Sequence, residues 1–372
     1  MATLNVWGLP APFAEDVGPR VRAIGAHLPT LGLDVVAFQE VWTPEARHSL
    51  VSAGVRAGLE NAWFNRTSLA GGGLLVLSRF PIEQAGFERF ALRGLPEQLA
   101  DGDYYSGKGL ARIRLKTDQG AFTLLCTHLQ AGTLPRAYCG HRAGQVVQLA
   151  LAARRSNDPI VAAGDFNFRE EDPEYRVLVG LAGLQDVAAT LDRRLPTVLS
   201  SNPYRGSSKS DRRIDYLFAR HGAERAVTPR SVQRIFDEPL ELGGRRAAYS
   251  NHSGVMADLE IGPGESPPPR PDRGAVELAA RLLSEGRLEA AGRRKGGRTW
   301  AALGLGCAAL SSASLLAPSV TRRRVLRGTL QAATLAALTP SLGFSVLSEI
   351  FVPDELRAFD RLVANLSRIN GA

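Results

Sequence analysis

Cysteine is scarce in this sequence, with three residues among 372. Cys126, Cys139 and Cys307 are too few and too widely spaced for a disulfide framework or for the paired cysteines of a zinc site. The beginning of the chain also lacks the charged and apolar regions of a secretory signal peptide, because residues 1–7 enter a strand-like run at once. We therefore expect a reducing compartment and a cytoplasmic location for residues 1–262.

Lysine is scarce as well, since only four of the 45 basic residues are lysines. The net charge of +8 is unevenly distributed: residues 263–372 carry 15 basic and 9 acidic residues, which leaves 30 and 28 in residues 1–262. Proteins that bind nucleic acid need cationic charge on the binding surface, because phosphate neutralisation dominates their affinity. The near-neutral balance of residues 1–262 argues against nucleic acid as a partner.

Apolar runs typical of β-strands recur through the first part of the chain and alternate with helical patterns, which predicts an α/β fold. Apolar residues at helical spacing predict helices over residues 17–28 and 142–153. The predicted strands cover residues 3–7, 34–39, 73–78, 109–115, 121–127, 159–164, 213–219 and 253–261.

Proline and glycine are concentrated in residues 262–274, which predicts an extended linker between two regions. We divide the chain into a first domain at residues 1–262, a linker at residues 263–274 and a helical, membrane-associating region at residues 275–372.

Two segments of the last region, residues 299–321 and 328–348, contain no charged residue and reach the ~20 residues that span a bilayer core. They follow an amphipathic helix predicted over residues 275–291. Basic clusters flank the first segment at both ends, so two full spans would place one cluster on the unfavourable side. A re-entrant or in-plane hairpin fits this pattern better. A soluble helical hairpin packed on the first domain is the alternative.

Polar side chains follow the ends of several predicted strands. Asp165 and Asn167 stand two positions apart after an apolar run, and residues i and i+2 of an extended chain face the same side. An Asx turn that closes the strand is the alternative interpretation. The other polar residues at strand ends are Asn5, Glu40, His128, Asp215, Asn251 and His252.

Together these residue types supply the parts of metal-assisted phosphodiester hydrolysis. Glu40, with help from Asn5, offers the hard oxygen ligands that suit Mg²⁺, and the metal polarises a phosphoryl oxygen. A His–Asp pair can take a proton from water, with the aspartate fixing the imidazole tautomer. Asn167 and His128 can stabilise the charge that develops on the phosphoryl group.

The order and wording of these strings resemble the endonuclease/exonuclease/phosphatase superfamily over about residues 1–261. The resemblance implies a DNase I-like, four-layer α/β sandwich with metal-dependent phosphoesterase activity, followed here by a C-terminal helical hydrophobic hairpin. It also implies roles for the site residues: Glu40 as principal metal ligand with Asn5 beside it, Asp165 orienting the attacking water, Asn167 and His128 binding phosphate, and His252 as the essential histidine with Asp215 as its partner.

Position 251 departs from the superfamily's usual Ser-Asp-His ending, because this chain has asparagine there. Asn251 keeps an oxygen near the metal but lacks the charge of aspartate. We therefore expect one Mg²⁺ site and weaker binding of a second cation. A chain that has lost its activity is the alternative.

Several strings further resemble the neutral sphingomyelinases, namely those at residues 4–10, 39–42, 73–82, 103–109 and 138–142. In that likeness Asp103 and Lys108 form an ion pair that gates the site, with Lys108 contacting the substrate phosphate or the surroundings of its headgroup. A weak ion pair in a surface loop is the alternative.

The sequence thus predicts a Mg²⁺-dependent sphingomyelin phosphodiesterase that releases phosphocholine and ceramide. We expect it at a membrane, with its catalytic domain on the cytoplasmic side, because tethering raises the effective concentration of a membrane substrate. The alternatives are a phospholipase C for lysophospholipid or another phospholipid, a nuclease or inositol-phosphate phosphatase of the same superfamily, and a non-catalytic membrane scaffold. Loops such as residues 64–72, 84–105 and 129–141 are expected to decide headgroup specificity.

Overall fold

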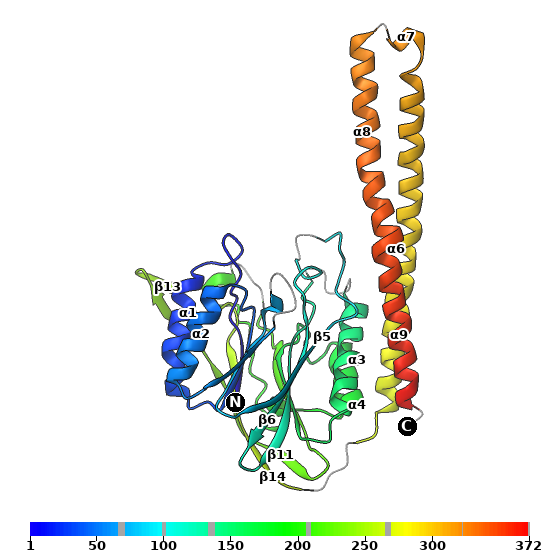
Figure 1. Ribbon diagram of the computed structural model, residues 1–372. Helices are drawn as coiled ribbons and strands as arrows, with labels where there is room; N and C mark the ends of the chain where they lie inside the picture. Colours follow the sequence, from blue (N-terminus) through cyan, green and yellow to red (C-terminus); the bar gives the residue numbers. More distant parts are fainter. Residues whose placement is uncertain are drawn as a thin grey trace.

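The computed structural model describes residues 1–65, 71–98, 102–132, 138–205, 210–264, 269–321 and 323–370. Two six-stranded β-sheets pack face to face, and helices cover the outer side of each sheet (Figure 1). The order of layers is helix, sheet, sheet, helix. This arrangement confirms the predicted four-layer α/β sandwich.

The first sheet has the strand order β11-β14-β1-β2-β4-β3, in which only β1 and β2 pair in parallel. Helices α1 and α2 cover its outer face through a buried apolar cluster. The elements of this half are β1 (Ala2–Asn5), α1 (Val17–His27), β2 (Val35–Gln39), α2 (Pro44–Arg56), β3 (Asn61–Phe64), β4 (Leu75–Ser78), β11 (Arg225–Ile235) and β14 (Gly254–Pro263).

The second sheet has the strand order β5-β6-β7-β8-β10-β9, in which only β7 and β8 pair in parallel. Helices α3 and α4 cover it, and a further apolar cluster fills the space between the sheets. The elements are β5 (Ile82–Arg89), β6 (Gly109–Thr117), β7 (Gly120–His128), α3 (Cys139–Arg154), β8 (Ile160–Asp165), α4 (Pro173–Ala182), β9 (Gln185–Asp186), α5 (Val187–Thr190) and β10 (Asp215–Arg220), with a small hairpin of β12 (Leu240–Leu242) and β13 (Arg245–Ala247) outside both sheets.

The eight predicted strands are all present, and they are the interior strands of the two sheets. Within the two sheets, the strands that were not predicted, β3, β5, β9 and β11, are the four edges; the hairpin of β12 and β13 outside the sheets was not predicted either. Interior strands such as β1, β2, β4, β8 and β10 are buried along their whole length and therefore read as apolar runs, whereas an edge strand such as β5 is mostly exposed.

The C-terminal region is a long antiparallel pair of helices. Helix α6 (Arg273–Ser314) runs unbroken through the basic residues 293–298, where we had expected the amphipathic helix to have ended. After α7 (Pro318–Thr321), helix α8 (Arg324–Val346) returns along α6 and continues through the π-helical turn η5 (Leu347–Phe351) into α9 (Val352–Asn370). The middle of the predicted linker, residues 265–268, lies outside the described residues.

The base of this helix pair is docked on the sandwich rather than loosely tethered. The first half of α6 packs against α3 and α4. The apolar face of α9 packs against α6 and α3, and all of these contacts belong to one buried cluster. The backbones of α3 and α6 touch at Gly140 and Gly286, where an added Cβ on Gly140 would lie 2.8 Å from Gly286 Cα. Beside this crossing, His141 Nε2 lies 3.0 Å from a carboxylate oxygen of Glu355 on α9.

Beyond the sandwich, the upper parts of α6 and α8 project together as two arms (Figure 1). Small residues face each other in the seam between the arms, and bulky apolar residues point outward. The seam contains Gly297, Ala301, Gly304, Ala308, Ser341 and Ser348, and the exposed residues include Trp300, Leu303, Leu305, Leu310, Leu335, Leu342 and Phe344. A soluble hairpin would bury the large residues; this reverse arrangement is typical of helices that pack together in lipid.

Of the described helices, the continuous one at Arg324–Arg368 is long and apolar enough to cross a membrane by length and composition, with a mean hydropathy of 1.6 in its most apolar window. The arm formed by the end of α6 does not meet the same criterion. The two predicted hydrophobic segments are thus unequal in the structure, although both belong to the projecting arms.

We predict that Gly304→Leu separates the two arms, because any side chain at this position overlaps the hydroxyl of Ser341. Overpacking of this kind costs about 1–3 kcal/mol. Thermal unfolding of the hairpin followed by circular dichroism in detergent would measure the loss. Gly306→Leu is the matched control, since a Cβ on Gly306 meets nothing within 4 Å. Equal melting of the two variants would contradict the proposed seam.

Candidate active site

The ends of β7, β8 and β10 bring three predicted site residues into one row. Asp165 is in register with His128 on β7 and with Asp215 on β10. All three side chains are buried. Gly164 makes this possible, because a Cβ there would overlap the carbonyl of Thr127 on the neighbouring strand. The register of the second sheet therefore assembles one wall of the site.

The first sheet supplies Asn5, the last residue of β1, and Glu40, which follows β2 at the same end of the sandwich. Asn5 Nδ2 donates to Glu40 Oε1 at 2.8 Å and to Asp165 Oδ2 at 3.0 Å. Its Oδ1 accepts from the backbone N–H of Trp7 at 2.9 Å. In this geometry Asn5 presents its amino group to the two carboxylates, so it orients both of them and joins the sheets.

Glu40 combines an unusual backbone with an unsatisfied oxygen. Its φ of 58° lies in the left-handed region, which costs on the order of 1–3 kcal/mol for a residue other than glycine. Its Oε2 is buried and has no hydrogen-bond partner in the described part of the chain. A buried carboxylate oxygen without a donor is unfavourable unless a cation or a proton neutralises it. The residues at this point therefore fit a hard divalent cation.

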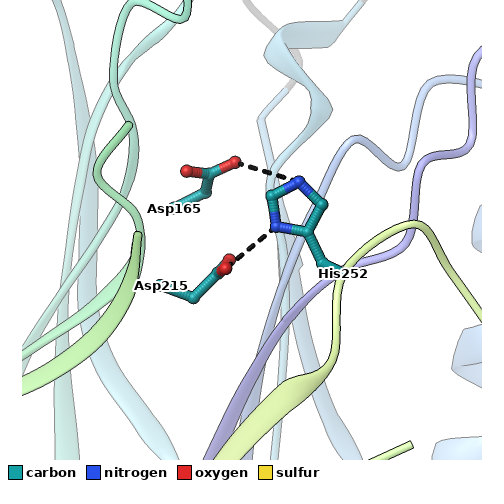
Figure 2. A group of neighbouring side chains, drawn as sticks. All are labelled: Asp165, Asp215 and His252. Carbon is teal, nitrogen blue, oxygen red and sulfur yellow. Dashed lines mark hydrogen bonds and ion pairs between the residues drawn. The ribbon is translucent and has the colours of Figure 1, made fainter. Parts of the chain in front are cut away.

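His252, in the turn before β14, lies between two carboxylates (Figure 2). Its Nδ1 is 2.9 Å from Asp215 Oδ2, and its Nε2 is 3.9 Å from Asp165 Oδ2. Burial lowers the pKa of His252, but the charges of Asp215 and then Asp165 outweigh this and raise the pKa above its usual value. Burial, followed by the charge of Asp215, raises the pKa of Asp165.

The same three side chains, Asp165, Asp215 and His252, place potential ligand atoms within 4.8 Å of one another and could themselves hold a metal ion. However, the short contact between His252 Nδ1 and Asp215 is that of a hydrogen-bonded pair, which commits this nitrogen to the carboxylate. We therefore regard Glu40 as the better centre for a cation and the His252–Asp215 pair as a proton acceptor.

Lys108 occupies the other side of Asp165. Its Nζ lies 2.8 Å from Asp103 Oδ1 and 3.1 Å from His128 Nε2, and donates to Leu129 O at 3.0 Å. The ion pair with Asp103 is buried, so its interpretation as a weak surface pair is wrong. Burial and the neighbouring cation of Lys108 lower the pKa of His128 well below its usual value, which keeps the imidazole neutral.

Asn167 reaches the site through a turn and not through an extended strand. β8 ends at Asp165, and Asn167 has a φ of 51°, so the expectation that both residues continue one strand face is wrong. Asp165 Oδ1 accepts from the backbone N–H of Asn167 at 3.0 Å, and Asn167 Nδ2 donates to Leu129 O at 3.1 Å. The Asx turn is therefore present, and it leaves Asp165 Oδ2 facing the site.

A cleft of about 710 Å³ opens over these side chains. Asn5 and Asp215 lie behind it, in contact with lining residues; Asn251 lines it, with its Oδ1 accepting from Ser250 Oγ at 3.4 Å. The other predicted residues that line the cleft are Glu40, Asp103, Lys108, His128, Asp165, Asn167 and His252.

An apolar wall of the cleft was not predicted. It consists of Trp7, Leu9, Pro10, Trp42, Pro44 and Tyr105. Each stands within a few residues of a predicted polar site residue, and this proximity is the feature in the sequence that could have indicated it. The loops expected to decide headgroup specificity are only partly described, since residues 66–70, 99–101 and 133–137 lie outside the described ranges.

Arg20 is a second residue that sequence reasoning missed. Its side chain is fully buried and donates to the backbone carbonyls of Val6, Trp7, Glu15 and Tyr249 at 2.7–3.1 Å. These carbonyls belong to the segments that carry Asn5 and His252. The feature in the sequence that could have indicated this buried role is an arginine among the apolar positions of the predicted helix at residues 17–28.

A model of the Endonuclease/Exonuclease/phosphatase family matches residues 2–252. The chain belongs to this family. The matched range contains every residue of the cleft described above, so the family assignment covers the whole candidate site.

The relatives to which this chain is similar include proteins named as lipid phosphodiesterases. The chain is 29% identical over 269 residues to a candidate neutral sphingomyelinase of Drosophila melanogaster, covering 70% of this chain and 60% of the relative. It is 30% identical over 190 residues to the inositol phosphosphingolipids phospholipase C of Schizosaccharomyces pombe (50% and 44%). It is 28% identical over 188 residues to the human sphingomyelin phosphodiesterase 2 (49% and 44%). The chain thus spans less than two thirds of the length of these relatives.

Solved structures share the fold at lower identity. TDP2 of D. rerio, complexed with a single-strand DNA product, aligns with a TM-score of 0.57 and 21% identity over 70% of this chain and 97% of that one. A Staphylococcus aureus beta toxin variant with bound magnesium ions aligns with a TM-score of 0.52 and 19% identity over 69% and 97%. At this identity the likeness shows the common sandwich alone.

We predict that Arg20→Met destabilises the sandwich, because four backbone carbonyls, that of Val6 in a buried hydrogen bond, lose their donor while the apolar bulk is kept. Each unsatisfied buried group costs about 1–3 kcal/mol. Urea unfolding followed by tryptophan fluorescence would report the loss. Arg22→Met, at an exposed position of the same helix, is the matched control. The role given to Arg20 is wrong if the two midpoints coincide.

Proposed function

We propose that this chain is a Mg²⁺-dependent phosphodiesterase that hydrolyses a phosphosphingolipid, with sphingomyelin as the first candidate, at a membrane. The observation that carries the proposal is the meeting of Glu40, Asp165 and His252 in one cleft that apolar side chains such as Trp7 and Trp42 also line. The relatives from Drosophila, fission yeast and human, whose names refer to sphingomyelin or phosphosphingolipids, support this substrate class.

The proposed cation site is built on Glu40. Its partnerless Oε2 would hold Mg²⁺, with the side-chain oxygen of Asn251 on the same cleft as a further ligand. Asn5 holds the other oxygen of Glu40 in place. When bound, Mg²⁺ would supply Lewis-acid polarisation of a phosphoryl oxygen. Because Asn251 carries no charge, a second cation would bind more weakly.

The proposed base is His252. Asp215 accepts the hydrogen of Nδ1, which fixes the tautomer of the neutral imidazole and leaves Nε2 to take a proton from water. Because the pKa of His252 is raised, this neutral, proton-accepting form becomes more abundant as the pH rises. Asp165 faces the same nitrogen and orients the attacking water through Oδ2. Its raised pKa lets it share the role of base. Attack on phosphorus opposite the lipid oxygen then releases the phosphorylated headgroup and the lipid alcohol.

The proposed phosphate-binding group is formed by Asn167, His128 and Lys108. Lys108 supplies positive charge next to a neutral imidazole, and such fixed donors stabilise charge that develops on a phosphoryl group. Asp103 holds Lys108 within the cleft wall. A change of partner by Lys108, from Asp103 to the phosphate, would open or close the site.

The proposed membrane attachment is the hairpin of α6 and α8. Its outward bulky residues, its small-residue seam and its two uncharged segments, residues 299–321 and 328–348, suit lipid better than water. In this proposal residues 1–262 form the catalytic domain on the cytoplasmic side, residues 263–274 the connection, and residues 275–372 the membrane-associating region. The arms stand away from the sandwich, which favours end-on insertion over an in-plane hairpin (Figure 1).

The first test compares headgroup release by wild type and His252→Ala from sphingomyelin vesicles with Mg²⁺. Loss of a general base is expected to lower turnover by about 10²–10⁴-fold, while His48→Ala, at an exposed position of α2, retains the wild-type rate. Vesicles containing an inositol phosphosphingolipid and a supercoiled plasmid are run in parallel. Nicking of the plasmid that depends on His252, without release from either lipid, would contradict a lipid substrate.

The second test concerns the charge at position 251. Asn251→Asp adds a carboxylate to the cleft beside Glu40, so half-maximal activity is expected at a lower Mg²⁺ concentration than in wild type. A Mg²⁺ titration of vesicle hydrolysis measures this. An unchanged titration curve would remove Asn251 from the cation site.

A further inference from the structure

The loop at residues 6–16, between β1 and α1, presents an apolar tip to solvent. The run from Val6 to Ala14 contains no charged residue. Phe13, near the end of this run, is 71% exposed. Among the described residues before α6, the other large exposed hydrophobic side chains are Val55 at 54% and Tyr105 at 52%. A single exposed hydrophobic side chain is ordinary, so the weight rests on where this uncharged run lies in the fold.

The loop is held at both ends, so the exposure of Phe13 is built into the fold. Arg20 donates to the carbonyls of Trp7 and Glu15, which flank the loop. Near its end, Asp16 accepts from the hydroxyl of Tyr204 at 2.8 Å. Within the loop, the backbone N–H of Phe13 donates to Pro10 O at 3.0 Å. These bonds fix the position of Phe13 without covering its ring.

The same loop forms one lip of the cleft, because Trp7, Leu9 and Pro10 line it. Tyr105, the other exposed ring, lines the cleft from the segment at residues 102–106. The two exposed aromatic side chains that precede the hairpin thus both stand beside the entrance of the site.

The cleft entrance and the hairpin face the same end of the molecule. The loop after β1, dark blue in Figure 1, rises toward the end from which the arms of α6 and α8 project. Tyr104, next to Tyr105, packs edge-on against Phe351 at the foot of α8, with ring centroids 5.7 Å apart. A bilayer entered by the arms would therefore lie in front of the cleft.

We propose that Phe13 and its loop are a second point of contact with the lipid bilayer, and that this contact and the hairpin together hold the cleft entrance against the membrane surface. The proposal rests on the proposed lipid phosphodiesterase function. A lipid bilayer is the proposed partner of this loop because the loop faces the same way as the apolar arms. Aromatic side chains are also favoured at the boundary of headgroups and acyl chains.

A direct test places a tryptophan at the tip. Full-length Phe13→Trp is mixed with phosphatidylcholine–sphingomyelin vesicles that contain brominated lipid, and the quenching of the added tryptophan is measured relative to the parent protein. Val55→Trp is the matched control, since Val55 is similarly exposed but lies at the far end of α2 from the cleft. Quenching at position 13 and none at position 55 is expected. Absence of quenching at position 13 would overturn the proposal.

A second measurement uses activity. For Phe13→Ser, the ratio of turnover on sphingomyelin vesicles to turnover on a water-soluble short-chain analogue is expected to fall about tenfold, because one buried aromatic side chain is lost from the membrane contact. Val55→Ser should leave the ratio unchanged, and an unchanged ratio in Phe13→Ser would overturn the proposal. If wild type hydrolyses neither substrate, the proposed function fails while the quenching experiment still decides the contact.

The competing occupant of this loop is a second copy of the chain. Sedimentation of wild type and Phe13→Ser in detergent separates the two possibilities. A dimer that is lost in Phe13→Ser would assign the loop to self-association and overturn the membrane contact. The same sedimentation behaviour for both proteins supports the bilayer as the occupant.

Discussion

The hydrogen bond from Asn5 Nδ2 to Asp165 Oδ2 joins the two sheets where the cleft opens. Most of the core between the sheets is an apolar cluster, which fixes their spacing without fixing the alignment of individual side chains. Just below, Gln39 donates to Thr3 at 3.0 Å within the first sheet and holds the ends of β1 and β2 together. Because Asn5 also holds Glu40, the cation side and the proton side of the site depend on this one amide group.

The site is assembled at a cost in local conformation and solvation. Trp7, Glu40 and Asn167 all have positive φ values and all line the cleft. The carboxylates of Asp165 and Asp215 are buried side by side, an arrangement that is unfavourable unless cations or donors face them. The sandwich tolerates this because its three apolar clusters are extensive and independent of the cleft. Strain concentrated at one end of a stable scaffold is typical of functional sites.

The sequence was sufficient for the interior strands and for the polar residues that follow them, because a carboxylate or imidazole interrupting an apolar run is visible locally. Edge strands such as β5 were not predictable, since half-exposed strands have no such run. The apolar wall of Trp7 and Trp42 and the buried Arg20 were missed for a different reason: their roles depend on segments that meet only after folding. The same applies to the seam of the hairpin, because only the packing of the two helices shows that Gly304 lies in the seam and that Leu303 points outward.

The close contact of α3 and α6 at Gly140 and Gly286 fixes the hairpin directly on the sandwich. If the hairpin anchors the chain in a bilayer and the cleft hydrolyses lipid, as we propose, the cleft could not reach lipid in a neighbouring vesicle. It would meet substrate only by lateral diffusion within the leaflet beneath it. Its rate would then follow the mole fraction of substrate in that surface: inert lipid mixed into the same bilayer would slow the reaction, whereas additional vesicles without enzyme would leave it unchanged.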